Sequence, residues 1–437
     1  MSDALRDPVD HRYVPGHGDE RYAVSAYDLD LLYVPETNRL SGIALISVRA
    51  ERRLPNLVLD LHHRLRVDKV LVDGKRPARF THKRDHLVVT LRQPLAAGDE
   101  VEVRVGYSGA PRTMPGLDGD AGWEELTDGS IVASQPHGAP SWFPCNDRPS
   151  DKASYRFEVT VPTGYAVVAN GVPGRSRRSA STVTFTFEQA EPMATYLASV
   201  HVGRVAVHDE PDAPVHVVSS RELADQARHA LRRQPEMLAL FEDRFGPYPF
   251  AAGYTTVVTD DDLEIPLEAQ ALSIFGANFM SDDWDAQRLV AHELSHQWFG
   301  NSLTLQHWND IWLHEGFACY AEWMWSEHLG DRTADEWARH HHARLAELPQ
   351  DLVLADPGPD LMFDDRVYKR GALAVHSLRL TLGDDAFFGL LRDWTDRFRH
   401  GSVRTIDLED LISERTDHEG SDLLGPWLRR PELPDLP

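Results

Sequence analysis

The chain is poor in cysteine, and it lacks both a long apolar run and an excess of basic residues. Only two cysteines, Cys145 and Cys319, occur among 437 residues, which excludes a disulfide framework and suits a reducing compartment. No apolar stretch approaches the length of about 18 residues that suggests a membrane-spanning helix. The first residues are polar and acidic and do not resemble a secretory signal. These absences predict a cytoplasmic protein.

The charge balance is strongly acidic. Lys and Arg total 45 against 69 Asp and Glu, which gives a formal net charge of −24. A surface of this sign repels nucleic acid and anionic membranes, so we expect neither as a partner. The hydrophobic fraction of 42% and the charged fraction of 26% are typical of a folded protein with a sizeable core.

Residues 1–205 are predicted to form an N-terminal domain of mostly antiparallel β-structure. Segments such as RYAVSAYDLDLLYV, VEVRVGY and YRFEVTV alternate apolar with polar residues, as strands with one buried face do. Turn signals such as Asp73-Gly74 separate them. From residue 206 the periodicity becomes mainly helical. We therefore expect a second, α+β domain over residues 206–437.

Several helices of this second domain can be placed by their periodicity. The segments are residues 221–246, 281–300, 309–330 and 335–348. Ser281 or Asp282 is expected to cap the second of them. The last contains His340, His341 and His342 between charged residues. We expect these three histidines to lie on a solvated helix face.

The second of these helices contains the sequence His292-Glu293-Leu294-Ser295-His296. Four residues are about one helical turn, so the two histidines project from one face and can share a metal ion. Neutral imidazoles suit zinc, which lowers the pKa of a bound water to about 7, and Glu293 can take that proton. The five residues alone also permit two surface or packed histidines on an amphipathic helix.

Glu315 lies 19 positions after His296, in the next predicted helix. Two helices joined by a turn can bring this carboxylate back to the paired histidines. The result is a zinc site of two histidines and one glutamate with an open fourth position. A glutamate in such an aromatic-rich helix is costly to bury without a partner, and a metal ion is one. The alternative is an exposed helix glutamate.

Several motifs together resemble the aminopeptidase N family of zinc peptidases, which includes the leukotriene hydrolases. The resemblance starts from HELSHQWFGN followed by WLHEGFACYAEW, and it extends over most of the chain in the same order. The further matching segments are SQPHGAPSWFPCNDRPSDKASY (134–155), FGPYPF (245–250) and VYKRG (367–371). The resemblance implies a thermolysin-like zinc catalytic domain over residues 206–437.

The resemblance also implies roles for individual residues. His292, His296 and Glu315 would bind one Zn²⁺ per chain. Glu293 would act as general base toward water and then as proton donor to the leaving amine. Tyr368 would donate a hydrogen bond to the oxyanion of the tetrahedral intermediate; by spacing alone it could equally be a core aromatic residue.

The substrate-binding residues depart from the family pattern. Glu268, 24 positions before His292, matches the family glutamate that pairs with a free α-amine, but Ala269 replaces the asparagine that follows it. Gln135 matches the family, whereas His137 stands where a second amine-binding Glu or Gln is usual. A histidine attracts an ammonium less than a carboxylate does. We therefore expect selectivity for free amines that is present but weakened.

The function predicted from the sequence is a zinc-dependent aminopeptidase that hydrolyses the N-terminal peptide bond of peptide substrates through a zinc-activated water. Alternatives are a zinc endopeptidase, an epoxide hydrolase of the leukotriene-hydrolase type, and a non-catalytic zinc-stabilised binding protein. Family members usually continue into a small β-sandwich and a large helical domain that covers the active site. This sequence resembles a short form without them, with a site that is more open or covered by another subunit.

Overall fold

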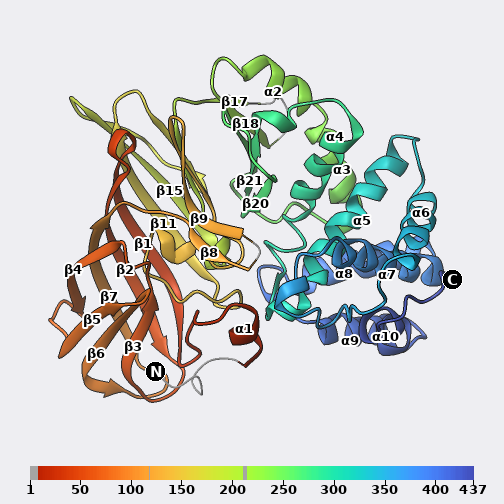
Figure 1. Cartoon of the computed structure of the whole chain (residues 1–437), viewed down its shortest axis with the longest axis horizontal. Helices are drawn as coiled ribbons and strands as arrows, with labels where there is room; N and C mark the ends of the chain where they lie inside the picture. Colours follow the sequence, from red (N-terminus) through yellow and green to blue (C-terminus); the bar gives the residue numbers. More distant parts are fainter. Residues whose placement is uncertain (1–7, 118, 210–213) are drawn as a thin grey trace.

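The computed structural model describes residues 8–117, 119–209 and 214–437. Figure 1 shows a half built of strands beside a half built mainly of helices. The predicted fold class, an antiparallel β domain followed by an α+β domain, is confirmed. In these ranges no helix combines the length and apolar character that crossing a membrane requires.

The largest sheet of the N-terminal half has the strand order β13-β15-β11-β1-β2-β7-β4, with β14 paired to β15. Its central strands bury alternate side chains, such as Leu29, Leu31 and Tyr33 of β1. The pairs are antiparallel except for β1 with β11. Its strands are β1 (Tyr22–Val34), β2 (Arg39–Ala50), β4 (Leu65–Val72), β7 (Glu100–Gly109), β11 (Ala153–Pro162), β13 (Val172–Pro173), β14 (Arg177–Arg178) and β15 (Thr182–Met193).

Two smaller sheets complete the N-terminal half. Their orders are β3-β6-β5 and β12-β16-β10-β9-β8. The loop that follows β10 carries Gln135 and His137. The strands are β3 (Leu54–Asp60), β5 (Arg79–Lys83), β6 (His86–Leu95), β8 (Met114–Gly116), β9 (Gly119–Leu126), β10 (Gly129–Ala133), β12 (Ala166–Ala169) and β16 (Val200–Gly203).

The second half begins with a sheet of order β17-β18-β19-β21-β20. The domain boundary predicted between residues 205 and 206 stays a prediction; it falls between β16 and β17. The edge strand β20 carries Glu268. The strands are β17 (Ala206–Asp209), β18 (Val215–Ser219), β19 (Tyr254–Thr259), β20 (Leu267–Ala269) and β21 (Leu272–Gly276), and β22 (Thr304–Leu305) pairs with β23 (Ser402–Val403) outside this sheet.

Helices make up most of the rest. The prediction of a single helix over residues 221–246 is wrong, because the chain forms two helices there, α2 (Ala224–Ala230) and α3 (Gln234–Phe245). Pro235 lies in the first turn of α3, where its missing N–H is tolerated. The predicted cap is also displaced: Asp283 accepts the hydrogen bond from Ala286 N at the start of α4. The helices are α1 (Pro8–Tyr13), α2 (Ala224–Ala230), α3 (Gln234–Phe245), α4 (Trp284–Ser295), α5 (Trp312–His328), α6 (Ala334–Ala346), α7 (Asp365–Leu382), α8 (Asp384–Arg397), α9 (Thr405–Arg415) and α10 (Gly420–Arg429).

The two halves share one continuous hydrophobic core. Tyr196 of the N-terminal half packs on Trp308 of the second half, with ring centroids 5.2 Å apart. The Lys152 ammonium donates hydrogen bonds to the carbonyl oxygens of Asn301 and Ser302 at 3.1 and 2.8 Å. These contacts fix the two halves relative to each other, which matters because the site described below takes residues from both.

Helices α5 and α7 touch at a pair of glycines, Gly316 and Gly371. A methyl group at Gly371 would lie 2.7 Å from Gly316 Cα, closer than carbon atoms pack. Two predicted site residues lie next to these glycines in sequence: Glu315 precedes Gly316, and Tyr368 lies one helical turn before Gly371. The close approach of the helices therefore brings Glu315 and Tyr368 toward each other.

We expect Gly371→Ala to destabilise the protein, because the added methyl group forces α5 and α7 apart. Overpacking of this kind typically costs about 1–3 kcal/mol. Urea unfolding would measure the loss. Gly389→Ala in α8 is the matched control, since a methyl group there would meet no atom within 4 Å. Equal stabilities of the two variants would contradict the proposed role of the glycine contact.

Candidate active site

Helix α4 presents His292 and His296 one turn apart, and both side chains are buried. His292 Nδ1 donates to Glu322 Oε1 at 2.8 Å, and His296 Nδ1 donates to the Phe299 carbonyl oxygen at 3.0 Å. Each hydrogen bond fixes the ring and leaves Nε2 free to ligate a metal ion, the usual arrangement in histidines that bind metals. Burial lowers the pKa of His296 to about 4, so its imidazole is neutral.

Glu315 of α5 reaches the same point. Its Oε2 lies 3.3 Å from His292 Nε2 and 3.6 Å from His296 Nε2. The three ligand atoms lie within 4.8 Å of one another, and all three residues are buried. The structure thus brings together the three residues that the sequence predicts as metal ligands.

The electrostatics of this cluster favour a cation. Burial lowers the pKa of His292, but hydrogen bonds with Glu315 and Glu322 more than offset it and raise the pKa to about 10. The field that would hold a proton on His292 equally attracts a divalent cation. In addition, Glu293 Oε2 is buried without a hydrogen-bond partner among the described residues. Two imidazoles, a carboxylate and a nearby free carboxylate oxygen fit a catalytic zinc site.

Glu322 is a functional residue that the sequence analysis missed. Besides binding His292, its Oε2 accepts a hydrogen bond from Arg288 Nη1 at 3.2 Å. Burial raises its pKa, but Lys369 and His292 outweigh that effect and lower the pKa to about 2, so the carboxylate is ionised. Its position seven residues after Glu315 places both on one face of α5, and that spacing was the available signal.

The predicted amine-binding residues meet beside this cluster. Gln135 Nε2 donates to Glu268 Oε1 at 2.6 Å. Glu268 is buried, which raises its pKa well above the usual range. One of its carboxylate oxygens lies within 4.8 Å of a carboxylate oxygen of Glu293 and of a ring nitrogen of His296. A strand of the second half and a loop of the first thus meet beside the three predicted metal ligands, His292, His296 and Glu315, which we call the zinc-ligand cluster.

Two further residues that the sequence analysis did not single out hold this strand against α4. Gln297 Nε2 and Asn301 Nδ2 both donate to the Ala269 carbonyl oxygen, at 3.2 and 2.9 Å. Gln297 Oε1 accepts from Ala271 N at 2.8 Å. Gln297 directly follows His296, and Asn301 lies shortly after it. The segment that carries His296 therefore also holds the backbone next to Glu268 in place.

His137 makes a different contact from Gln135. Its Nε2 donates to the Met114 carbonyl oxygen at 3.0 Å, and its ring lies 5.9 Å from that of His17. Burial and the neighbouring His17 lower its pKa. The imidazole is therefore neutral near pH 7, and it neither attracts nor repels a substrate ammonium strongly.

Tyr368 of α7 lies over His292, with ring centroids 6.1 Å apart. Burial, together with Glu315 and Glu268, raises the pKa of its phenol well above the usual value. The phenol therefore stays protonated and can donate a hydrogen bond next to the zinc-ligand cluster.

Comparisons with known proteins agree with this geometry. The family model described as "Peptidase M1 N-terminal domain" matches residues 23–197, and the model described as "Peptidase family M1 domain" matches residues 229–427. The structure of an M1 zinc metallopeptidase from Deinococcus radiodurans superposes with a TM-score of 0.90 at 33% identity, covering 99% of each chain. The chain belongs to the peptidase M1 family. The resemblance stated from the motifs is confirmed.

Other relatives include a leucyl aminopeptidase from Saccharolobus solfataricus, 24% identical over 94% of this chain and 54% of the relative. Aminopeptidase M1 from Arabidopsis thaliana is 26% identical over 70% of this chain and 37% of the relative. The M1 chain thus spans about half the length, or less, of these curated relatives. A mutant of the Deinococcus enzyme, 33% identical with a TM-score of 0.90 and 99% coverage of both chains, was solved bound to a Tyr-Ser-Ala substrate.

We expect Glu322→Gln to weaken zinc binding about 10–100-fold, because the residue that orients His292 loses its charge. Chelator competition would measure the zinc affinity. The matched control is Glu327→Gln in the same helix, whose carboxylate binds Arg379 at 2.8 Å. Zinc affinities that are equal in the two variants would remove the positioning role assigned to Glu322.

Proposed function

We propose that this chain is a zinc-dependent aminopeptidase that releases the first residue of peptides, with one catalytic zinc ion per chain. The observation that carries the proposal is the contact of Glu268 with Gln135 directly beside Glu293 and His296. A carboxylate there can hold a substrate's free α-amine while the first peptide bond lies at the zinc-ligand cluster. The names of the M1 relatives support the same activity.

The chemistry follows from the positions of the side chains. Zinc held by His292, His296 and Glu315 would supply a Lewis acid that lowers the pKa of water to about 7. Glu293 accepts a proton from the attacking water and passes it to the leaving amine. Burial raises the pKa of the Glu293 carboxyl group, which makes its carboxylate a stronger proton acceptor. Its buried Oε2 is available for both transfers. Tyr368 donates a hydrogen bond to the oxyanion that develops on the substrate carbonyl.

Glu268 and Gln135 orient the substrate. An ammonium next to Glu268 favours its ionised form and so opposes the effect of burial on its pKa. Gln135 fixes the direction of that carboxylate. Endopeptidase cleavage is the second candidate function, because the neutral His137 replaces the second amine-binding carboxylate or amide of the family pattern.

The test is a mass-spectrometric time course with zinc-loaded protein on peptides supplied in free and N-acetylated form. We expect stepwise loss of N-terminal residues from the free peptides only. Internal cuts, or equal cleavage of the acetylated peptides, would establish the endopeptidase instead.

Glu268→Gln should raise KM for the free peptides about tenfold or more, since a charged hydrogen bond is lost. An equal effect on acetylated peptides would show that Glu268 does not bind the amine.

We expect Glu293→Gln to lower kcat by about 10²–10⁴, because the amide cannot accept the proton from water. Zinc content, measured by elemental analysis, should remain at the wild-type level, since Glu293 is not a ligand in this assignment. Activity near wild type in a fully zinc-loaded variant would contradict the mechanism.

We further propose a cytoplasmic location. Both cysteines are free and buried, Cys145 in the N-terminal half and Cys319 in α5, which suits a reducing compartment. Recovery of the chain in a non-cytoplasmic fraction of its host cells would overturn this proposal.

A further inference from the structure

Two adjacent histidines, His62 and His63, lie in the N-terminal half, on elements that do not carry the zinc-ligand cluster. They belong to the loop between β3 and β4, and Asp85 lies in the turn between β5 and β6. Figure 1 shows these strands in the half of the molecule that is built of strands. One possible ligand atom of each of the three residues lies within 4.8 Å of the other two, a limit that the zinc-ligand cluster also meets.

Asp85 is held at this point by the backbone. Arg84 and Asp85 form the two-residue turn of a hairpin, and their φ angles are 50° and 63°, a conformation that aspartate adopts more readily than most residues. The Asp85 carbonyl oxygen accepts a hydrogen bond from Leu61 N at 2.9 Å. Its Oδ1 accepts another from His63 N at 2.7 Å. The hairpin turn is thus fastened to the loop that carries the two histidines.

The ring of His63 points at the same carboxylate. Its Nδ1 donates to Asp85 Oδ1 at 2.8 Å. Bonds of about 2.0–2.2 Å place the ligands of one zinc ion roughly 3–4 Å apart, so a small movement of the ring accommodates an ion. The side chains of His63 and Asp85 are 58% and 36% exposed, and an ion can therefore reach them from water.

His62 carries the second observation that points to a metal ion. It is 5% exposed, and its Nδ1 is buried with no hydrogen-bond partner among the described residues. A buried polar atom without a partner costs free energy, and a metal ion would supply that partner. Burial lowers the pKa of the ring, which Asp85 opposes and which His63 and Arg64 reinforce. The imidazole is therefore neutral near pH 7 and keeps a lone pair for a cation.

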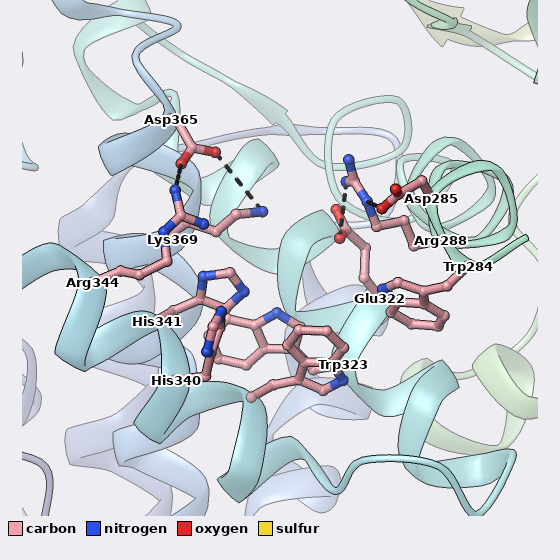
Figure 2. Close-up of a pocket in the computed structure, with 11 residues that line it drawn as sticks. Trp284, Asp285, Arg288, Glu322, Trp323, His340, His341, Arg344, Asp365 and Lys369 are labelled. Carbon is pink, nitrogen blue, oxygen red and sulfur yellow. Dashed lines mark hydrogen bonds and ion pairs between the residues drawn. The ribbon is translucent and has the colours of Figure 1, made fainter.

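A buried ring nitrogen without a partner is not sufficient by itself, as His341 of α6 shows. The expectation that this residue lies on a solvated face is wrong, because it is 7% exposed. Its ring stacks on Trp323, with centroids 5.4 Å apart and planes at 5°, at the wall of a cavity of about 310 Å³ (Figure 2). Its Nδ1 has no hydrogen-bond partner in the described part of the chain. In those same ranges, however, His341 belongs to no group of three possible metal ligands, whereas His62 does.

The donor set indicates the kind of metal ion. Two imidazole nitrogens and one carboxylate oxygen suit zinc and its neighbours among the transition metals, whereas magnesium and calcium prefer oxygen ligands throughout. We propose that His62, His63 and Asp85 bind a second metal ion, zinc or a neighbouring transition metal, on elements separate from the zinc-ligand cluster. This inference does not rest on the proposed peptidase activity.

The ion would join the loop after β3 to the turn between β5 and β6. His62 N also donates to the Pro140 carbonyl oxygen at 2.9 Å, in the segment that continues from Gln135 and His137. The site is therefore structural: it steadies a loop that is bonded to the segment proposed to orient the substrate.

Elemental analysis after dialysis against micromolar free zinc counts the bound ions. We expect two zinc ions per chain in the wild type and one fewer in His63→Gln and in Asp85→Asn. Both side chains reach the surface, and asparagine also tolerates the positive φ of residue 85, so the fold is preserved. Chelator competition should show that either substitution weakens zinc binding at this site more than about tenfold.

His229→Gln is the matched control. His229 is exposed and lies 2.7 Å from Asp282 Oδ2, but the pair has no third metal ligand beside it in the described ranges. Its zinc content should equal that of the wild type, and a large excess of magnesium should displace no zinc. A wild-type zinc content in both His63→Gln and Asp85→Asn would overturn the proposal, as would displacement of this ion by magnesium.

The same count separates this site from the proposed catalytic one. His296→Ala removes a ligand of the catalytic site alone, so His63→Gln should remove a further ion from that variant. A wild type that binds a single ion, which His63→Gln loses, would support this site and refute the catalytic zinc. A single ion that His296→Ala loses and His63→Gln keeps would overturn this site and leave the catalytic zinc in place.

Discussion

The site depends on the orientation of two imidazoles. His292 and His296 each use Nδ1 in a hydrogen bond, to Glu322 and to the Phe299 carbonyl oxygen, so that both Nε2 atoms face Glu315. Without those bonds the rings could rotate and the ligand atoms would not converge. The contact between α5 and α7 serves the same end, because it sets where Glu315 lies relative to Tyr368. The metal chemistry is thus a consequence of helix packing.

The proposed substrate orientation depends on a different constraint, the interface between the two halves. Gln135 comes from a loop of the N-terminal half, and Glu268 comes from an edge strand of the second. Their contact requires the halves to be fixed relative to each other, which the shared core and the Lys152 hydrogen bonds achieve. Metal binding could survive a loosened interface, since its ligands lie on α4 and α5 alone. Amine recognition could not.

The sequence predicted what local periodicity determines and missed what tertiary packing determines. The pairing of His292 with His296 follows from one helical turn, and the fold class follows from the change of periodicity near residue 206. The break before Pro235 was missed because helical periodicity continues on both sides of it. His341 was misplaced because its neighbours in sequence are charged, whereas its neighbours in space are indoles of α5 and α6. Glu322 was missed because its spacing from Glu315 indicates only a shared helix face, whereas its role comes from His292, 30 residues earlier in the chain.

The predicted selectivity for a free amine depends on a single charged side chain. His137 is neutral and bonded to the Met114 carbonyl oxygen, so of the three predicted amine-binding residues only Glu268 would supply a negative charge for an ammonium. Burial raises the pKa of Glu268, which favours its uncharged form. An incoming ammonium favours the carboxylate and opposes that effect. Amine binding and ionisation of Glu268 would therefore be coupled, and a substrate without a charged amine would leave the carboxyl protonated.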